Sequence, residues 1–263
     1  MNIKIIQGLV LTATLALAWP AGLQAEETEY AFSGSLGAAV AVMPEFEGSD
    51  RYEAKLRPAL NLEFGPLFLS TSRGLGLNLV SAPGWTVAPA LHYRWARKEK
   101  DSDLLRGLGD IDDGLEAGGV IRWQPGPAGL GLKVYQGLGS LEGLTAELEA
   151  DYGAALTDDL SGSVGLSAMF ADRKYNRSYF GVTPEQSRKS WQSQKSGYEE
   201  YDPEAGLKHA AVFGALNYAL TDHLGLGLLA QYKRLTGPAA DSPLVERGSA
   251  NQFISALSVS FKF

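Results

Sequence analysis

The sequence has no cysteine, three histidines, three methionines and a single long hydrophobic run. The absence of cysteine excludes disulfides, thiolate metal sites and thiol nucleophiles. Basic residues are also scarce, since 23 lysines and arginines stand against 30 acidic residues and the formal net charge is -7. This balance argues against a nucleic-acid partner, which requires a basic surface. With 45% hydrophobic residues, the chain is nevertheless too apolar to be disordered.

The hydrophobic run lies at the extreme N-terminus, over residues 5–19. It follows Lys4, leads into small residues that end at Ala25, and is about 15 residues long, whereas a membrane-spanning helix needs about 20. These features predict a secretory signal peptide over residues 1–25, with an uncleaved anchor as the alternative. The mature chain is then residues 26–263. A secreted chain without cysteine is typical of a bacterial envelope protein.

The mature chain alternates apolar and polar residues in segment after segment. The pattern runs over residues 55–64, 85–95, 144–154 and 253–263, and no segment shows a convincing helical period. Alternation with a period of two is typical of strands that have one apolar and one polar face. The 31 glycines disfavour helices further. The sequence therefore predicts an all-β fold.

The spacing of aromatic residues distinguishes a membrane barrel from a soluble sandwich. Trp85 and Trp95 lie ten residues apart on one face of a predicted strand, as do Phe253 and Phe263. Ten residues at about 3.3 Å each, tilted by about 40°, rise roughly 25 Å, which is the height of the apolar band of an outer-membrane barrel. We therefore predict a transmembrane antiparallel up-and-down β-barrel in the Gram-negative outer membrane, in contact with outer-membrane lipid and lipopolysaccharide.

Short and long connections alternate along the chain, as periplasmic turns and extracellular loops do. The short ones are residues 65–66, 81–84, 125–129, 157–159 and 221–223, and the long ones are residues 43–52, 97–113, 172–204 and 237–251. Further reversals near residues 73–74 and 141–143 give about twelve strands with both termini in the periplasm. Residues 67–80 are compatible with one strand or two. The last strand ends in Phe263, which resembles the signal that the barrel assembly machinery recognises.

The predicted inward faces carry charges of both signs in nearly equal number. Ion-selective pores usually have one dominant sign along the lumen, so the balance predicts a narrow or occluded lumen with cross-strand ion pairs such as Lys133 with Glu149. The candidate lumen charges are Lys55, Arg57, Glu63, Arg94, Glu116, Arg122, Lys133, Glu147, Glu149, Asp151 and Lys233.

Enzyme motifs are absent from the sequence. There is no nucleophile elbow, Ser-x-x-Lys, His-Glu-x-x-His or phosphate-binding loop, so neither a catalytic activity nor a cofactor is predicted. His92 and His209 are expected in the lumen as ordinary polar residues, with a catalytic pair as the alternative. Residues 110–114 match a calcium-binding loop poorly, because glycine and glutamate are misplaced. A solvated acidic loop without a bound metal is the favoured interpretation.

Several stretches occur in a specific order along the chain. They are PEFEGSD (44–50), RGLGDI (106–111), YFGVTPEQS (179–187), YDPEAGL (201–207), RL (234–235) and DSPLV (241–245). This ordered set resembles the MipA/OmpV family of outer-membrane proteins, from which residues 188–200 depart by being longer. Glycine and proline are frequent in these stretches, which favours a backbone-shaping role. The candidate loop positions are Gly48, Ser49, Asp50, Gly107, Gly109, Asp110, Phe180, Gly181, Gln186, Asp241, Ser242 and Pro243.

The resemblance implies a non-enzymatic barrel that acts as an interaction or scaffold protein. In this family the implied partners are a murein transglycosylase and a penicillin-binding protein, with a link to peptidoglycan synthesis or envelope stress. The predicted periplasmic turns are short, so such a partner would have to bind the turns, the barrel rim or residues 26–29. Two alternatives remain open, a passive or gated channel for small solutes and an adhesin-like surface protein that uses the long loops.

Overall fold

The structure is a computed structural model that describes residues 31–194 and 197–263. The predicted signal peptide, residues 1–25, lies outside the described residues. Within the described ranges, no helix combines the length and the apolar character that crossing a bilayer requires.

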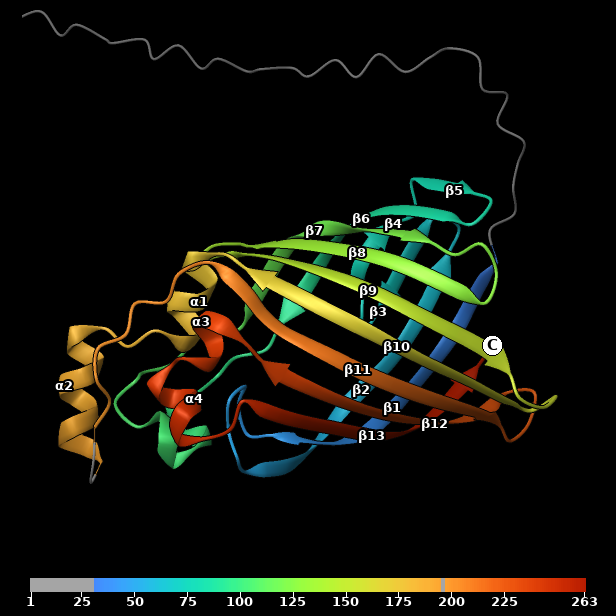
Figure 1. The fold of residues 1–263 in the computed structure, drawn as a ribbon. Coiled ribbons are helices and arrows are strands. Elements are labelled where there is room, and N and C mark those ends of the chain that lie inside the picture. The colour runs from blue at the N-terminus through green and yellow to red at the C-terminus, as the bar shows by residue number, and fades with distance from the viewer. Residues whose placement is uncertain (1–30, 195–196) are drawn as a thin grey trace, which may run out of the picture. The chain divides into compact units, whose positions relative to one another are not determined.

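Antiparallel strands form one sheet that contains more than half of the residues of the unit 31–263 (Figure 1). Each strand alternates inward-facing small or polar residues with outward-facing apolar ones, as the sequence pattern predicts. The strands are β1 (Phe32–Pro44), β2 (Tyr52–Phe64), β3 (Leu67–Ser70), β4 (Gly74–Leu77), β5 (Val80–Ala82), β6 (Trp85–Arg94), β7 (Gly114–Trp123), β8 (Ala128–Gly137), β9 (Leu144–Ala155), β10 (Leu160–Ala171), β11 (Gly206–Ala219), β12 (Leu224–Leu235) and β13 (Asn251–Lys262).

The sheet closes into a barrel because β4 pairs with β6, with Leu75 opposite Leu91. β5 pairs with β6 as well and continues the course of β4 after an interruption at Asn78 and Leu79. The thirteen described strands therefore occupy twelve positions around the ring, which confirms the predicted closed antiparallel barrel. Residues 67–80 contain two strands rather than one, because the chain reverses at residues 71–73 between β3 and β4.

The two ends of the barrel differ in their connections (Figure 1). We call the end that carries residues 65–66, 124–127, 156–159 and 220–223 the turn end, and the opposite end the loop end. The C-terminus lies at the turn end, where the Phe263 ring stacks on Phe32 with centroids 5.1 Å apart. Pairing of β1 with β13 thus brings both ends of the described unit to the same end of the barrel.

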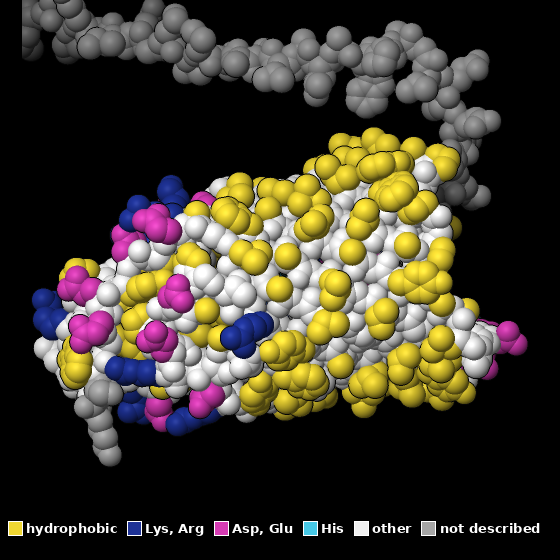
Figure 2. Space-filling view, in the orientation of Figure 1, with side chains coloured by type: hydrophobic (Ala, Val, Ile, Leu, Met, Phe, Trp, Pro, Cys, Tyr) yellow, Lys and Arg dark blue, Asp and Glu magenta, His cyan; other side chains and the backbone are white. Residues whose placement is uncertain are grey.

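Large apolar side chains cover the outside of the strands. Leu56, Val164 and Leu166 are 74%, 63% and 62% exposed, and Figure 2 shows hydrophobic side chains spread over the strands while charged ones gather at the loop end. Near the turn end, Trp85 packs against Trp123 with ring centroids 6.0 Å apart. Apolar surface of this extent, with aromatic residues at its edge, matches the lipid-facing band of an outer-membrane barrel.

The long connections at the loop end fold together into what we call the cap, formed by residues 45–51, 95–113, 172–194, 197–205 and 236–250 (Figure 1). Each connection contributes to a buried hydrophobic cluster of Phe46, Leu105, Leu108, Val182, Tyr198 and Leu244. A second cluster contains Ala171, Tyr175, Phe180, Leu235, Ala239 and Val245 and joins the cap to the strands. The loops therefore form a folded layer over the barrel mouth.

Short helices within the cap correct the expectation that no segment is helical. They are η1 (Glu99–Asp101), η2 (Asp103–Leu105), α1 (Arg173–Phe180), α2 (Pro184–Ser193), α3 (Gly237–Ala240) and α4 (Pro243–Arg247). Their caps are local, since Asp172 Oδ1 accepts a hydrogen bond from Tyr175 N at 2.8 Å and Thr183 Oγ1 accepts one from Gln186 N at 3.2 Å. Segments this short have too few turns to show a reliable helical period.

Candidate functional site

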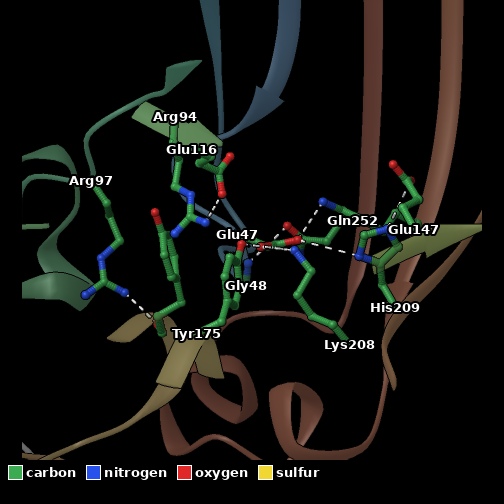
Figure 3. A network of polar contacts seen from close by, with 12 residues as sticks. Glu47, Gly48, Arg94, Arg97, Glu116, Glu147, Tyr175, Lys208, His209 and Gln252 are labelled. Atoms are coloured by element: carbon green, nitrogen blue, oxygen red, sulfur yellow. Dashed lines mark hydrogen bonds and ion pairs between the residues drawn. The ribbon is translucent and has the colours of Figure 1, made fainter. Parts of the chain in front are cut away.

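Glu47 reaches from the β1–β2 connection into the mouth of the barrel (Figure 3). Its carboxylate accepts hydrogen bonds from Lys208 Nζ at 3.0 Å and from Lys233 Nζ at 2.7 Å. The adjacent Gly48 has a φ of +110°, which favours glycine, and its N–H donates to Gln252 Oε1 at 3.1 Å. A Cβ at Gly48 would also lie 2.8 Å from Val245 Cγ2. The backbone at this point thus holds the carboxylate between two lysines.

A β-bulge turns Lys208 toward the interior. Met169 pairs with His209 and Phe170 pairs with Leu207, so that Lys208 is the extra residue on β11. Regular alternation would place Lys208 and His209 on opposite faces, but both are buried, at 4% and 5% exposure. A bulge re-aims a side chain in this way. The irregularity in β11 therefore supplies the second cation that faces Glu47.

His209 links this cluster to a neighbouring strand. Its Nδ1 lies 4.0 Å from Glu47 Oε1, and its Nε2 lies 4.0 Å from Glu147 Oε1 on β9. Glu147 Oε2 is in turn 3.7 Å from Lys133 Nζ, which donates to Glu149 Oε2 at 2.8 Å. These charged and polar side chains form a continuous series along the inner wall, from the β1–β2 connection to β8.

Tyrosines of α1 carry the network toward β6 and β7. Lys208 Nζ donates to Tyr175 Oη at 3.3 Å, and the Tyr175 and Tyr179 rings stack with centroids 4.6 Å apart. Arg94 Cζ lies 4.7 Å from the Tyr175 ring centroid, within the range of a cation–π contact, and the Arg94 guanidinium contacts Glu116 on β7. Because β6 and β11 are far apart around the ring, the network crosses the barrel mouth (Figure 3).

Burial and neighbouring charges shift the ionisation of groups in the cap. Burial by itself raises the pKa of Glu47, but Lys208 and Lys233 outweigh burial and leave that pKa well below its usual range. Burial raises the pKa of Tyr179 to about 12 and lowers the pKa of Arg97 to about 10. At neutral pH Glu47 is therefore negative, Tyr179 is neutral and Arg97 is positive.

The candidate lumen charges lie on the inner faces of their strands, and many pair with one another. The Lys133–Glu149 pair expected from the sequence is present. Pairs inside the candidate set are Lys133–Glu149 (2.8 Å), Lys133–Glu147 (3.7 Å), Arg122–Asp151 (2.9 Å) and Arg94–Glu116. Partners from outside the set are Glu53 for Lys55 (2.6 Å), Arg73 for Glu63 (3.5 Å), Glu47 for Lys233 (2.7 Å) and the Trp95 ring for Arg57 (4.4 Å to the centroid).

The candidate loop positions come together in the cap. Ser49 and Ser242 are fully buried, whereas Asp50 and Asp241 are exposed. Ser242 Oγ donates to the Phe180 carbonyl at 2.7 Å and so ties two connections together. Further roles are Gly181 at the C-cap of α1 and Pro243 at the start of α4.

Hydrogen bonds also hold the β6–β7 connection in place. Gly107 N and Gly109 N donate to the two oxygens of Glu99 at 2.8 Å and 3.1 Å, and Asp110 Oδ1 accepts from Glu99 N at 2.8 Å. Gln186 Nε2 donates to the Leu108 carbonyl at 2.6 Å. These positions shape and join the loops of the cap.

Sequence reasoning missed the central residues of the network, Glu47, Lys208 and Gln252. Glu47 belongs to the stretch at 44–50, yet a carboxylate in a loop carries no sign that it points inward. Alternation counted from His209 directs Lys208 outward, because a bulge is not visible in the pattern. Gln252 lies on the inward face of β13 and is 1% exposed. Its position next to Phe253, on the polar face of the alternating segment, was the available signal.

Ion pairs are the main polar contacts of this region. Among the described residues, no group of three or more His, Asp or Glu side chains is placed to hold a metal ion. His92 Nδ1 lies 3.1 Å from Glu116 Oε2, while His209 belongs to the separate Glu47 cluster. The two histidines are thus not brought together.

Comparison with known proteins places the chain in a family. The model described as MltA-interacting protein MipA matches residues 36–263. The "24 kDa outer membrane protein" of Pasteurella multocida (strain Pm70) is 25% identical over 234 residues, which cover 82% of this chain and 87% of that protein. Among solved structures, the NanC porin has a TM-score of 0.49 at 10% identity and covers 88% of this chain and 100% of its own. A bacterial polysaccharide outer membrane secretin has a TM-score of 0.45 at 11% identity, with 88% and 98% covered.

The family match confirms the resemblance seen in the ordered stretches, and the relative from Pasteurella multocida is itself an outer-membrane protein. The closed barrel with its apolar outer face agrees with that location. The chain belongs to the MltA-interacting protein MipA family and is a β-barrel of the Gram-negative outer membrane.

Proposed function

We propose that this protein is a non-enzymatic interaction protein of the outer membrane whose lumen is closed at the loop end. The observation that carries the proposal is the network around Glu47, in which Lys208 and Lys233 bind one carboxylate inside the barrel mouth. Above it, the loops of the cap share one hydrophobic cluster. A mouth crossed by ion pairs and covered by a folded layer suits a binding surface better than a permanently open pore.

The partner we propose is a periplasmic enzyme of murein synthesis or turnover, bound at the turn end. The family name refers to interaction with MltA, and a periplasmic partner would meet the end of the barrel that carries the C-terminus. Exposed acidic residues lie there in two turns, at Asp158, Asp159 and Asp222. A partner with a basic surface would complement them.

Pull-down with the detergent-solubilised protein from a periplasmic extract tests this proposal. We expect recovery of a murein transglycosylase or synthase, and weaker recovery with the triple variant Asp158→Asn, Asp159→Asn, Asp222→Asn. A matched control neutralises three exposed acidic residues of the cap, Asp50→Asn, Asp241→Asn and Glu246→Gln. Recovery of no murein enzyme by the unaltered protein would remove the murein link.

A gated channel is the second candidate, because the inside of the barrel is not filled throughout. A cavity of about 460 Å³ is lined by small polar residues, which include Ser35, Asn61, Ser70, Asn217, Ser258 and Ser260. Planar-bilayer recording distinguishes the candidates. A closed mouth predicts no steady conductance for the unaltered protein, whereas regular conductance steps would favour the channel. Glu47→Ala should then increase the conductance, and Glu185→Ala, at an exposed ion pair, should not.

A further inference from the structure

A cavity of about 560 Å³ opens in the cap, between the β6–β7 connection and α1. Its wall includes Arg94, Arg97, Lys174 and Arg177 together with Tyr179. Figure 3 places Arg94 and Arg97 at one end of the polar network, away from Lys208 and His209. The volume lies in the range of small-molecule sites, about 300 to 1,000 Å³.

Two guanidinium groups in this wall, those of Arg94 and Arg97, each have a nitrogen without a hydrogen-bond partner among the described residues. Arg97 Nη1 donates to the Tyr179 carbonyl at 2.7 Å, but among the described residues its buried Nε has no hydrogen-bond partner. Arg94 contacts Glu116 through Nη2 and its side chain is 10% exposed, while its buried Nη1 is likewise without a partner in the described part of the chain. Buried donors are almost always satisfied, so unsatisfied ones indicate a missing acceptor.

The Arg97 side chain is held in a fixed position. Its backbone forms an isolated bridge with Ile111, with N–H to carbonyl distances of 2.9 Å and 2.8 Å, and its guanidinium is fixed by the bond to Tyr179. Ordering such a side chain in advance reduces the entropy lost when a ligand binds. The arrangement is therefore a prepared site rather than a mobile surface arginine.

The carboxylates near this cavity are mostly paired with cations other than Arg97. Asp110 and Asp112, which also line the cavity, lie 3.5 Å and 2.5 Å from Lys98 Nζ. Arg177 is paired with Asp202 at 3.1 Å. Within the described residues neither Arg97 nor Lys174 has a carboxylate within 4.0 Å, and the exposed Glu142 on the same wall offsets one of these two charges. Asp110 and Asp112 share Lys98, so the formal charges around the cavity balance. What favours an anion here is the position of the unsatisfied guanidinium donors and not a net positive charge.

We propose that this cavity binds a small hydroxylated oxyanion, whose carboxylate or phosphate group accepts hydrogen bonds from Arg97 and Arg94. Guanidinium groups bind both kinds of oxyanion through charge-assisted hydrogen bonds. Hydroxyl and amide groups of Ser140, Ser178, Thr183 and Gln186 line the remainder of the wall and can bind ligand hydroxyls. The proposal concerns the cap and is independent of the partner at the turn end.

Isothermal titration of the detergent-solubilised full chain tests the site with three probes of similar size. Glucuronate carries a carboxylate, glucose 6-phosphate carries a phosphate, and glucose is the uncharged control. We expect saturable binding of at least one charged probe and none of glucose, and the stronger of the two identifies the anion. Arg97→Gln should weaken this binding about tenfold or more, since a charge-assisted hydrogen bond is lost.

The matched control is Arg188→Gln, which removes one charge from an exposed position of α2 outside the cavity wall. Arg97→Lys separates charge from geometry, because lysine keeps the charge but lacks the planar fork, and it should restore binding only in part. Heat-modified mobility on gels checks that each variant is a folded barrel. Equal binding of glucose and the charged probes, or equal weakening by Arg97→Gln and Arg188→Gln in folded protein, would overturn the proposal.

Discussion

Glu47 is a loop residue whose carboxylate finds its partners only when the barrel has formed. Its side chain is 18% exposed, and the partners Lys208 and Lys233 lie more than 150 residues further along the chain. A carboxylate in such a place would be unfavourable if it were alone, because burial disfavours its charged form. The two lysines offset this cost and also fix the position of the loop.

Glu47→Gln should destabilise the folded protein by about 3 kcal/mol, since it leaves two lysines buried without their carboxylate. Denaturant unfolding in detergent micelles measures the change. The control Glu185→Gln disrupts the exposed pair with Lys189 and should change the stability by less than about 1 kcal/mol. Similar decreases in the free energy of unfolding in the two variants would show that the Glu47 cluster contributes no more to stability than an exposed ion pair.

The same carboxylate predicts a loss of stability in acid. The folded pKa of Glu47 lies below its ordinary value of 4.5, so the ionised form stabilises the fold at every pH above that value. As the pH falls below about 4.5, the unfolded state takes up the proton first and this contribution decreases. The difference in stability between the unaltered protein and Glu47→Gln should therefore be largest at pH 6 and smaller at pH 3. A difference that stays constant between these pH values would contradict this assignment.

At the residue scale, the sequence was sufficient where a side chain belongs to a regular strand. Lys133 and Glu149 lie on the same inner face of two paired strands, where Lys133 is opposite Glu147 and diagonal to Glu149. A pattern of period two contains that information. The pattern does not predict where Lys208 points, since an extra residue in β11 reverses the direction of its side chain. The pattern does not predict the direction of the Glu47 side chain either, because tertiary packing alone decides where a loop side chain points.

At the scale of elements, the cap is held by packing between connections that are far apart in sequence. Tyr198 is fully buried in its cluster, and its hydroxyl donates to the Leu104 carbonyl at 2.8 Å. Arg247 adds a cation–π contact, with its Cζ 4.0 Å from the Tyr198 ring centroid. One aromatic side chain thus joins three of the long connections.

Tyr198→Ala should loosen the cap while the barrel remains folded. Removing a buried aromatic side chain costs about 3 to 5 kcal/mol, and here the loss falls on the loops and not on the strand ladder. Limited proteolysis should then cut within residues 95–113 or 172–205 at lower protease concentrations than in the unaltered protein. Trp191→Ala, at a residue that is 52% exposed, serves as the aromatic control and should leave the cleavage pattern unchanged.

The strands and the cap differ in how far they could be predicted. Twelve positions in the ring follow from alternation and from the spacing of turns, because each strand must place one face in lipid. The helices of the cap do not follow, since α1 has eight residues and α2 has ten. These helices are stabilised by burial against neighbouring loops. The sequence of one short segment does not reveal such packing.

At the scale of the whole molecule, the outward face of the barrel is adapted to hydrocarbon. Leu166→Arg, in the middle of β10, should destabilise the protein in lipid by about 2 to 4 kcal/mol. Ser163→Arg, on the inward face of the same strand, should have a much smaller effect because it enters a polar cavity. Folding into lipid vesicles, followed by tryptophan fluorescence, measures both. Equal effects would show that lipid does not contact the face that carries Leu166.

The contact between Gly48 and Gln252 joins residues 204 positions apart and depends on the pairing of the first strand with the last. The mouth of the barrel can therefore acquire its final form only after the whole chain has been inserted. We expect an assembly intermediate that still lacks β13 to lose the contact of Gln252 with Gly48 and to hold the adjacent Glu47 less firmly. With the closed lumen proposed above, completion of the wall and closing of the loop end become one event in biogenesis, and we predict that a barrel arrested before that event conducts small ions.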